Sequence, residues 1–409
     1  MRCAGIADAR GTAPASDSLL VQTTGPRARL VLAIGTLAEV SAHPAYASAE
    51  RVDLPDRVVA PALVNAHAHL DLTHIGPQPM GEGGFAGWID MVRRGRHAGD
   101  ADIASSVREG VELLLRGGTA AVGDIAGSVG GVASLAPARV LDGVAMAGVS
   151  YLEFFALSPD GSPGLDAAME RAGGFQPVHL RLGLEPHAPY SASLGAYRRA
   201  IATGMPVCTH LAESLAEREL VAAGGGPIAD MLGGLGLWTD AVAGQFGAGR
   251  SPVGHLDGVL EGVLAVHLND LSDGDIQSLA GSGARAAFCP RASAYFGAPE
   301  HFGPHRYRDL LAAGVPVALG TDSVVNLPLE AVAARGICVL DEALLLHERD
   351  GVDPDVLLVM LYKHGPECLG LPEQMLAPGR EVLGLISVER GLGEAGRVLV
   401  VSQGEISFL

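Results

Sequence analysis

The sequence predicts an α/β protein, a (β/α)8 TIM barrel with a small β-sandwich domain built from both chain ends. Eight apolar, strand-like segments follow one another between residues 58 and 323, and most are separated by segments with helical periodicity. Alternating strands and helices indicate a parallel sheet, and eight such units over about 300 residues have the size of a (β/α)8 barrel. An open doubly wound sheet is the alternative, but no G-x-G-x-x-G after a first strand supports it.

The domain boundaries follow from where this alternation begins and ends. The barrel is expected over residues 58–369, and the small domain over residues 1–57 and 370–409. Residues 18–35 resemble a hairpin with a Gly-Pro turn, and the last forty residues return to short strands. The two chain ends should therefore meet beside the barrel.

The barrel elements can be placed in order. The first strand is expected within residues 58–74, and helices with apolar residues at i, i+3, i+4 spacing over 85–97 and 104–118. Crossover segments, mostly helical or rich in Gly and Ala, separate the later strands. These seven strand candidates are 119–126, 141–156, 178–189, 205–214, 262–270, 284–293 and 315–323.

Composition limits the function classes. The chain of 409 residues is 48% hydrophobic, which is ample for a large core, and its formal net charge of −18 argues against nucleic-acid binding. The five cysteines are scattered without a C-x-x-C pair, which predicts free thiols in a reducing compartment. No apolar run reaches the roughly 18 residues of a membrane span, so a cytoplasmic protein is expected.

An H-x-H pair, His67 and His69, ends the first predicted strand. Side chains i and i+2 of a strand point to the same face, so the two imidazoles can bind one cation together. Taken alone, the pair is explained equally well as two hydrogen-bonded histidines near a strand end. Its meaning depends on what the other strands place at the same end.

Further ionisable residues follow other predicted strands. The C-terminal ends of barrel strands carry the chemistry of this fold. Each residue alone has a structural explanation, since a strand-end His is commonly a loop hydrogen-bond partner and an Asp before Ser a helix cap. Their joint placement at one end of the barrel predicts a metal site. The residues are His67, His69, His187, His210, Glu213, His267 and Asp322.

The motifs around these residues resemble those of the amidohydrolase superfamily, in the branch of metal-dependent deaminases and chlorohydrolases. They are PALVNAHAHL, EPHAPYS, THLAES, VHLND, FCPR and ALGTDS, and the similarity covers nearly the whole chain. The resemblance implies a hydrolase with one divalent ion, zinc by default and ferrous iron as the alternative. The implied ligands are His67, His69, His210 and Asp322.

The same resemblance implies roles for three more residues: Glu213 carries protons, His267 orients the attacking water and His187 touches the substrate. The physical chemistry agrees, because a divalent ion lowers the pKa of bound water towards about 7. Asp322 can then accept a proton from that water, and Glu213 can protonate a ring nitrogen of a heterocycle. The expected reaction is hydrolytic deamination, with the division of labour known from zinc base deaminases of another fold.

Lys363 is the only lysine, and it lies beyond the last predicted strand. Binuclear members of the superfamily bridge their metals with a carboxylated lysine at the fourth strand, where this chain has His187. The sequence therefore predicts a mononuclear site and argues against the dihydroorotase, hydantoinase and urease branches. Ala292 and Ser293 follow the CPR motif where related proteins often have Ser-Asn, which leaves the substrate less defined than the metal site.

Residues 83–96, GGFAGWIDMVRRGR, resemble the corresponding segment of aminodeoxyfutalosine deaminases. Trp88 can stack on a base, although a core position on an amphipathic helix is an equally good explanation. Arg291, or one of the arginines Arg93, Arg94 and Arg96, can bind a substrate anion, although a solvated helix face explains the last three as well. The predicted substrate is an adenine-type nucleoside such as aminodeoxyfutalosine.

Two other interpretations stay open from the sequence. A chlorohydrolase or a cyclic amidohydrolase would share the same ligands, so only its products would distinguish it. A binding or scaffold protein with a decayed site is the second alternative, and the intact ligand positions argue against it. The expected partner is a small-molecule substrate, with homo-oligomer formation left open.

Overall fold

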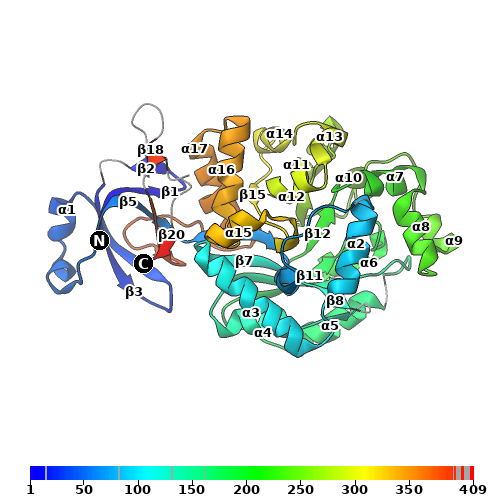
Figure 1. Ribbon diagram of the computed structural model, residues 1–409, viewed down its shortest axis with the longest axis horizontal. Coiled ribbons are helices and arrows are strands. Elements are labelled where there is room, and N and C mark those ends of the chain that lie inside the picture. The colour runs from blue at the N-terminus through cyan, green and yellow to red at the C-terminus, as the bar shows by residue number, and fades with distance from the viewer. Residues whose placement is uncertain are drawn as a thin grey trace.

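The computed structural model describes residues 1–13, 16–81, 83–129, 132–161, 163–389, 391–392, 398–399 and 406–409. Figure 1 places both chain termini in a small β structure on the left, next to a larger body in which helices surround a ring of strands. Among the described helices, none combines the length and apolar composition needed to cross a bilayer.

Strands from both chain ends join in one eight-stranded sheet, in the order β16-β4-β3-β1-β5-β17-β20 with β2 paired to β1. The predicted hairpin over residues 18–35 is confirmed, because β3 and β4 pair antiparallel. The meeting of the two ends is also confirmed, whereas the two stacked layers of a sandwich stay a prediction. The strands are β1 (Arg2–Asp8), β2 (Gly11–Ala13), β3 (Ser18–Thr23), β4 (Arg29–Gly35), β5 (Asp53–Pro61), β16 (Glu381–Val382), β17 (Leu385–Glu389) and β20 (Ile406–Phe408).

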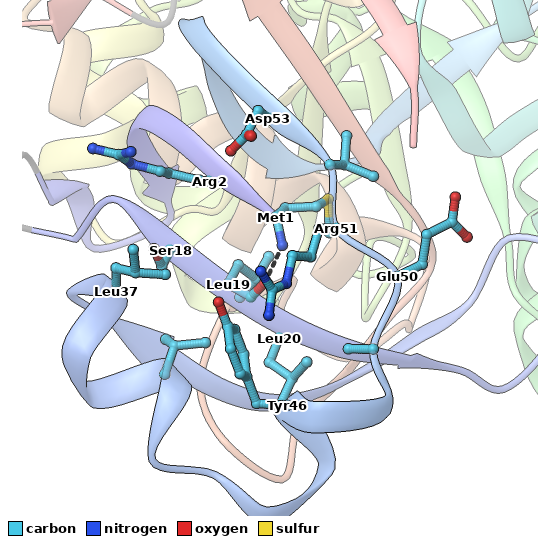
Figure 2. Close-up of a pocket in the computed structure, with 13 residues that line it drawn as sticks. Met1, Arg2, Ser18, Leu19, Leu20, Leu37, Tyr46, Glu50, Arg51 and Asp53 are labelled. Atoms are coloured by element: carbon cyan, nitrogen blue, oxygen red, sulfur yellow. Dashed lines mark hydrogen bonds between the residues drawn. The ribbon is translucent and has the colours of Figure 1, made fainter.

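A cavity of about 190 Å³ opens in this small sheet, and all of its lining comes from residues 1–53. Figure 2 shows Tyr46 and Arg51 among the side chains that line this cavity with Met1, whose N-terminal ammonium donates to the carbonyl of Leu19 at 2.8 Å. The cavity is therefore a feature of the small sheet, separate from the barrel residues that the sequence singled out. The C-terminal strand predicted over 396–409 falls partly on residues 396–397 and 400–405, which lie outside the described residues.

The segment predicted as one strand over residues 58–74 is wrong in its extent, because it contains two strands and a 3-10 helix. Strand β5 ends at Pro61, β6 spans Leu63–Ala68, and the 3-10 helix η2 spans Leu70–Ile75. The pairing changes at Ala62, whose N–H donates to Gly384 in the small sheet, while the N–H of Leu63 donates to Gly118 in the barrel. The chain thus passes from one body to the other within two residues.

Eight parallel strands form a TIM-barrel-like body in chain order. They fall into two four-stranded sheets, β11-β10-β7-β6 and β12-β13-β14-β15. Single parallel bridges, Leu184 with Val207 and Ala68 with Asp322, connect the edges of the two sheets. The predicted order is confirmed; β7 has the predicted extent, and the other strands are shorter than expected. They are β6 (Leu63–Ala68), β7 (Thr119–Ala126), β10 (Ala147–Phe154), β11 (Arg181–Pro186), β12 (Cys208–Leu211), β13 (Leu264–His267), β14 (Arg285–Phe288) and β15 (Val317–Leu319).

Amphipathic helices surround these strands, and their buried faces follow the helical period. In α3, Ile103, Val107, Val111 and Leu114 are buried on one face, which matches the spacing seen in the sequence. Helices α2 and α3 confirm the two predicted after the first strand. The main helices are α2 (Gly84–Gly95), α3 (Asp100–Arg116), α4 (Ala136–Gly143), α5 (Gly164–Gly173), α6 (Leu194–Ala202), α7 (Leu215–Ala223), α8 (Pro227–Gly234), α11 (Asp273–Ser282), α12 (Pro290–Tyr295), α14 (Tyr307–Ala312) and α16 (Val339–Asp350).

Candidate active site

The sequence-selected residues lie at the C-terminal ends of barrel strands, the end called the barrel mouth below. His67 lies near the end of β6, His210 near the end of β12, and His267 is the last residue of β13. Asp322 follows β15, and its N–H donates to the carbonyl of His67 at 3.1 Å. The backbone at His267 and Asp322 has φ of 75° and 57°, a left-handed conformation that non-glycine residues rarely adopt. The chain therefore turns sharply where these two side chains leave the strands.

Four side chains form a compact cluster, consisting of His67, His69, His210 and Asp322. Asp322 Oδ1 lies 3.5 Å from His67 Nε2 and 3.3 Å from His69 Nε2. His69 Nε2 lies 3.2 Å from His210 Nε2. None of the four is more than 7% exposed. The three chain segments thus bring one nitrogen of each imidazole and one carboxylate oxygen to a common point.

Glu213 and His267 extend this cluster on one side. His267 Nε2 lies 3.4 Å from Glu213 Oε1, and both residues are buried. The backbone around Glu213 is fixed by two neighbours: its N–H donates to Glu217 at 2.7 Å, and its carbonyl accepts from Asn269 at 2.9 Å. The Glu213 carboxyl is therefore held in place beside the cluster.

Burial changes the protonation of these groups in opposite directions. Desolvation raises the pKa of Glu213 well above its ordinary value, and the charges of Asp322 and Glu217 add to this rise. Burial alone would also raise the pKa of Asp322, but contact with His67 and the neighbouring histidine charges hold it well below its ordinary value. Desolvation lowers the pKa of His267 to about 3. One carboxyl is thus suited to carry a proton at neutral pH, and the other is ionised.

The four-residue cluster fits a divalent cation. Both ring nitrogens of His67 and Nδ1 of His69 are buried without a hydrogen-bond partner among the described residues. The nitrogens of His67, His69 and His210 that could bind an ion all lie within 4.8 Å of one another. Three imidazoles and one carboxylate form a ligand set typical of zinc, and buried lone pairs that face each other need a cation between them.

A cavity of about 380 Å³ opens from this cluster to the surface. His69, His210, Glu213 and Asp322 lie at its base. Its walls are mostly apolar and come from helix α2, from the strand ends and from the segment around helix α8. These wall residues are Leu72, Phe85, Trp88, Ile89, Val92, Phe155, Leu157, Tyr190, Met231, Leu232, Leu235 and Leu237.

A buried charged network forms the polar part of the cavity wall. Arg96, at the end of α2, lies 3.0 Å from Asp71 and 2.9 Å from Glu153. Glu153 in turn lies 3.8 Å from Nε2 of His187, whose Nδ1 is 3.0 Å from Ser191 Oγ. Arg96, Glu153 and His187 all line the cavity, so a ligand with hydroxyl groups would find both donors and acceptors there.

Three comparisons with known proteins bear on this site. The sequence pattern described as the amidohydrolase family matches residues 58–380. The chain belongs to the amidohydrolase family.

This amidohydrolase is 31% identical over 373 residues to the aminodeoxyfutalosine deaminase of Deinococcus radiodurans, covering 83% of this chain and 81% of that protein. It is 27% identical over 311 residues to a 5-methylthioadenosine/S-adenosylhomocysteine deaminase of Nitratidesulfovibrio vulgaris, covering 72% and 62%. Together with the family membership, these relatives identify a hydrolase that acts on carbon–nitrogen bonds.

Solved structures confirm the fold. The aminofutalosine deaminase of Helicobacter pylori in complex with methylthio-coformycin has a TM-score of 0.75 at 18% identity, covering 99% of this chain and 96% of that one. A zinc-containing atrazine chlorohydrolase of Arthrobacter aurescens has a TM-score of 0.72 at 19% identity, covering 97% and 88%. Both support a TIM-barrel-like fold with an additional domain.

The remaining predicted residues of this amidohydrolase lie at different distances from the cavity. Trp88 and Arg93 line it, although Arg93 also pairs with Asp90 on the same helix. Arg94 is exposed and pairs with Asp90 as well. Arg291 lies elsewhere: its guanidinium is 3.3 Å from Asp341 and 3.7 Å from Glu342 on α16, and it is not among the cavity-lining residues.

Sequence reasoning missed several buried carboxylates near the mouth. Asp124, Glu153 and Glu185 lie at the ends of β7, β10 and β11, and all three are buried. Glu153 and Glu185 are direct neighbours across the β10–β11 pairing. The rule that selected the histidines, polar residues at the C-terminal ends of strands, would also have selected these three.

Proposed function

We propose that this amidohydrolase removes the amino group of an adenine-type nucleoside such as aminodeoxyfutalosine, with water as co-substrate and ammonia as product. One observation carries the proposal: a buried carboxyl with a raised pKa, Glu213, lies next to the four-residue cluster at the base of one cavity. Deamination needs a proton donor at this place, because a neutral ring nitrogen must be protonated as the amino-bearing carbon is attacked. The deaminase relatives support the same chemistry.

His67, His69, His210 and Asp322 would hold one divalent ion, for which zinc is the proposed identity. A divalent ion at this place lowers the pKa of water and so supplies hydroxide at neutral pH. Lys363, the only lysine, is exposed and lies in the helical segment Met360–His364, so no lysine is available to bridge a second ion at the fourth strand. The proposed site is therefore mononuclear.

The chain's own residues divide the proton transfers between them. The lowered pKa of Asp322 favours its ionised form, which can accept a proton from the attacking water, while the raised pKa of Glu213 favours its protonated form, which can donate to the ring nitrogen. His267 is neutral at pH 7 and lies 3.4 Å from Glu213, so it can orient the attacking water by hydrogen bonding beside that carboxyl. The second proton of the water leaves with the amino group as ammonia, and the ring carbon keeps the oxygen.

The cavity wall fits a nucleoside with a modified ribose. Glu153, Arg96 and His187 offer polar contacts to sugar hydroxyls: the Glu153 carboxylate, paired with Arg96, can accept a hydrogen bond, and Arg96 can donate one. Beyond them, Phe85 and Trp88 of α2 and Leu235 near α8 form an apolar wall. This arrangement favours an apolar or aromatic substituent on the sugar over a free hydroxyl group.

The test is ammonia release together with the change in purine ultraviolet absorbance. Aminodeoxyfutalosine, 5′-methylthioadenosine and adenosine should be compared, and the substituted nucleosides should react faster than adenosine. Atrazine and a cyclic amide are the contrasting substrates, with chloride release and ring opening followed separately. Turnover of either contrasting substrate, with all three nucleosides inert, would overturn the deaminase proposal and leave the fold and family unaffected.

A further inference from the structure

The two ring nitrogens of His210 face different surroundings. Nε2 points towards the four-residue cluster, where it lies 3.2 Å from His69 Nε2. Nδ1 points away from the cluster, 3.1 Å from the backbone carbonyl of His187 and 3.1 Å from Glu185 Oε1. The His187 carbonyl accepts hydrogen bonds and cannot donate them, so Nδ1 carries the ring hydrogen. Nε2 is then left with its lone pair facing the cluster.

Glu185 is buried to an unusual degree for a carboxylate. Its side chain has no solvent exposure, and neither oxygen has a well-aligned hydrogen bond among the described residues. His210 is its only ion-pair partner within 4.0 Å in that part of the chain. A carboxylate in such a place costs several kcal/mol unless a positive group compensates it. Arg96 supplies positive charge nearby, and the imidazole of His210 adds to it when its other nitrogen binds a cation.

The strand arrangement fixes this contact. Glu185 lies on β11 and His210 on β12, and the N–H of His210 donates to the carbonyl of His187 at 2.9 Å. The backbone carbonyl alone would set the tautomer of His210. What the carboxylate adds is negative charge behind the ring, which increases the electron density that Nε2 can give to a cation.

We infer that Glu185 is a positioning residue for the metal ion: it orients His210 through Nδ1 and strengthens the binding of a divalent cation at Nε2. The inference rests on the metal site of the proposed function but not on the substrate. Zinc binding is measured without substrate, so failure of the deaminase proposal and failure of this inference give different results.

The experiment compares zinc affinity in three proteins. Glu185→Gln keeps the size and the acceptor oxygen of the side chain but removes its charge. Glu342→Gln is the matched control, because Glu342 is also fully buried but contacts Arg291 and no cluster histidine. Competition with a chelating dye should give a zinc Kd for Glu185→Gln about 10–100-fold higher than for the wild type. The control should bind zinc like the wild type, and the melting temperature of metal-free Glu185→Gln should show that it is folded.

Equal zinc affinity of Glu185→Gln and the wild type would overturn the inference, as would an equal loss in the Glu342→Gln control. A second measurement uses the wild type alone, in case the variant does not fold. On zinc binding, the Nδ1 proton of His210 should shift downfield in the NMR spectrum, because zinc increases the positive charge that the ring presents to Glu185 Oε1, 3.1 Å from Nδ1. A zinc-bound His210 that carries its proton on Nε2, or an Nδ1 proton that does not shift, contradicts the role of Glu185.

Discussion

The side chains at the barrel mouth are placed to bind a cation rather than to hydrogen-bond to one another. The nitrogens of His67, His69 and His210 converge with the carboxylate of Asp322, and several of them have no hydrogen bond among the described residues. We therefore expect about one divalent ion per chain in the purified protein, measured by elemental analysis. His67→Ala should lose most of it, whereas His301→Ala, at an exposed histidine, should keep it. Two tightly bound ions, or full activity without any, would contradict the mononuclear site.

Substitution of Glu213 should impair proton transfer without affecting metal binding. Glu213→Gln keeps the size of the side chain but cannot deliver a proton, so turnover should fall by about 10² or more. Metal content and melting temperature should stay those of the wild type, because Glu213 is not one of the four proposed ligands. Glu219→Gln, at an exposed position on helix α7, which follows Glu213, serves as the control with normal turnover. Loss of the metal in Glu213→Gln would show that Glu213 is a ligand.

The buried imidazole of His305 should make the free energy of unfolding depend on pH. Desolvation lowers its pKa from 6.5 to about 4, although Nε2 donates to the carbonyl of His267 at 2.7 Å. Between these two values the unfolded chain binds a proton that the folded chain does not, so this contribution to stability is lost as the pH falls. His305→Gln keeps an N–H donor for that carbonyl but does not titrate. Urea unfolding from about pH 4 to 7 should show a shallower pH dependence for the variant than for the wild type, and identical slopes would refute the assignment.

The residues that sequence reasoning could place at the site were those on strand ends with a recognisable motif. The motif residues His67, His69, His210, Glu213, His267 and Asp322 do come together in the structure. Arg291 also follows a strand, but a strand-end position does not reveal that α16 provides Asp341 and Glu342 as partners for its charge. Contacts between elements far apart in the chain depend on packing, which no local pattern contains.

At the scale of elements, periodicity identified the helices and strands better than it located their ends. The segment 119–126 coincides with β7, whereas the segment 58–74 is divided among β5, β6 and η2. Both strands in that segment are apolar, so the sequence shows no break where the chain changes its hydrogen-bonding partners at Ala62. The boundary is set by the small sheet, whose C-terminal strand β17 pairs with β5 and leaves β6 to the barrel.

Helix α2 is held to the barrel by Arg96, and this contact can be tested. Arg96→Met should destabilise the protein by about 3–5 kcal/mol, because Asp71 and Glu153 would stay buried without their shared cation. Arg94→Met is the matched control on the same segment, since its exposed pair with Asp90 is screened by solvent and contributes little to stability. Urea denaturation of both variants measures the difference. Similar losses for the two arginines would mean that the buried network does not hold α2 in place.

At the scale of the whole molecule, two strands place side chains in the hydrophobic cores of both the small sheet and the barrel. Alternate residues of β17 face opposite ways, so Ile386 and Val388 pack in the barrel core while Leu385 packs in the core of the small sheet. Strand β5 does the same, with Val58 towards the barrel and Val59 towards the small sheet. The predicted boundary between residues 57 and 58 falls within β5, and the domain limits stay a prediction. Two strands with one face in each core couple the stability of the two bodies.

This coupling predicts the effect of a substitution that touches only the small sheet. Leu385→Ala should cost about 2–5 kcal/mol, the usual range for a buried leucine. Both tryptophans of the chain, Trp88 and Trp238, lie in the barrel region, so their fluorescence reports its unfolding, while far-ultraviolet circular dichroism reports all secondary structure. If the two bodies unfold together, Leu385→Ala shifts the urea midpoint of both signals equally, and Val178→Ala, at a side chain that is 80% exposed, shifts neither. A fluorescence midpoint that stays at the wild-type value while the dichroism splits into two phases would instead show that the barrel folds independently of the small sheet.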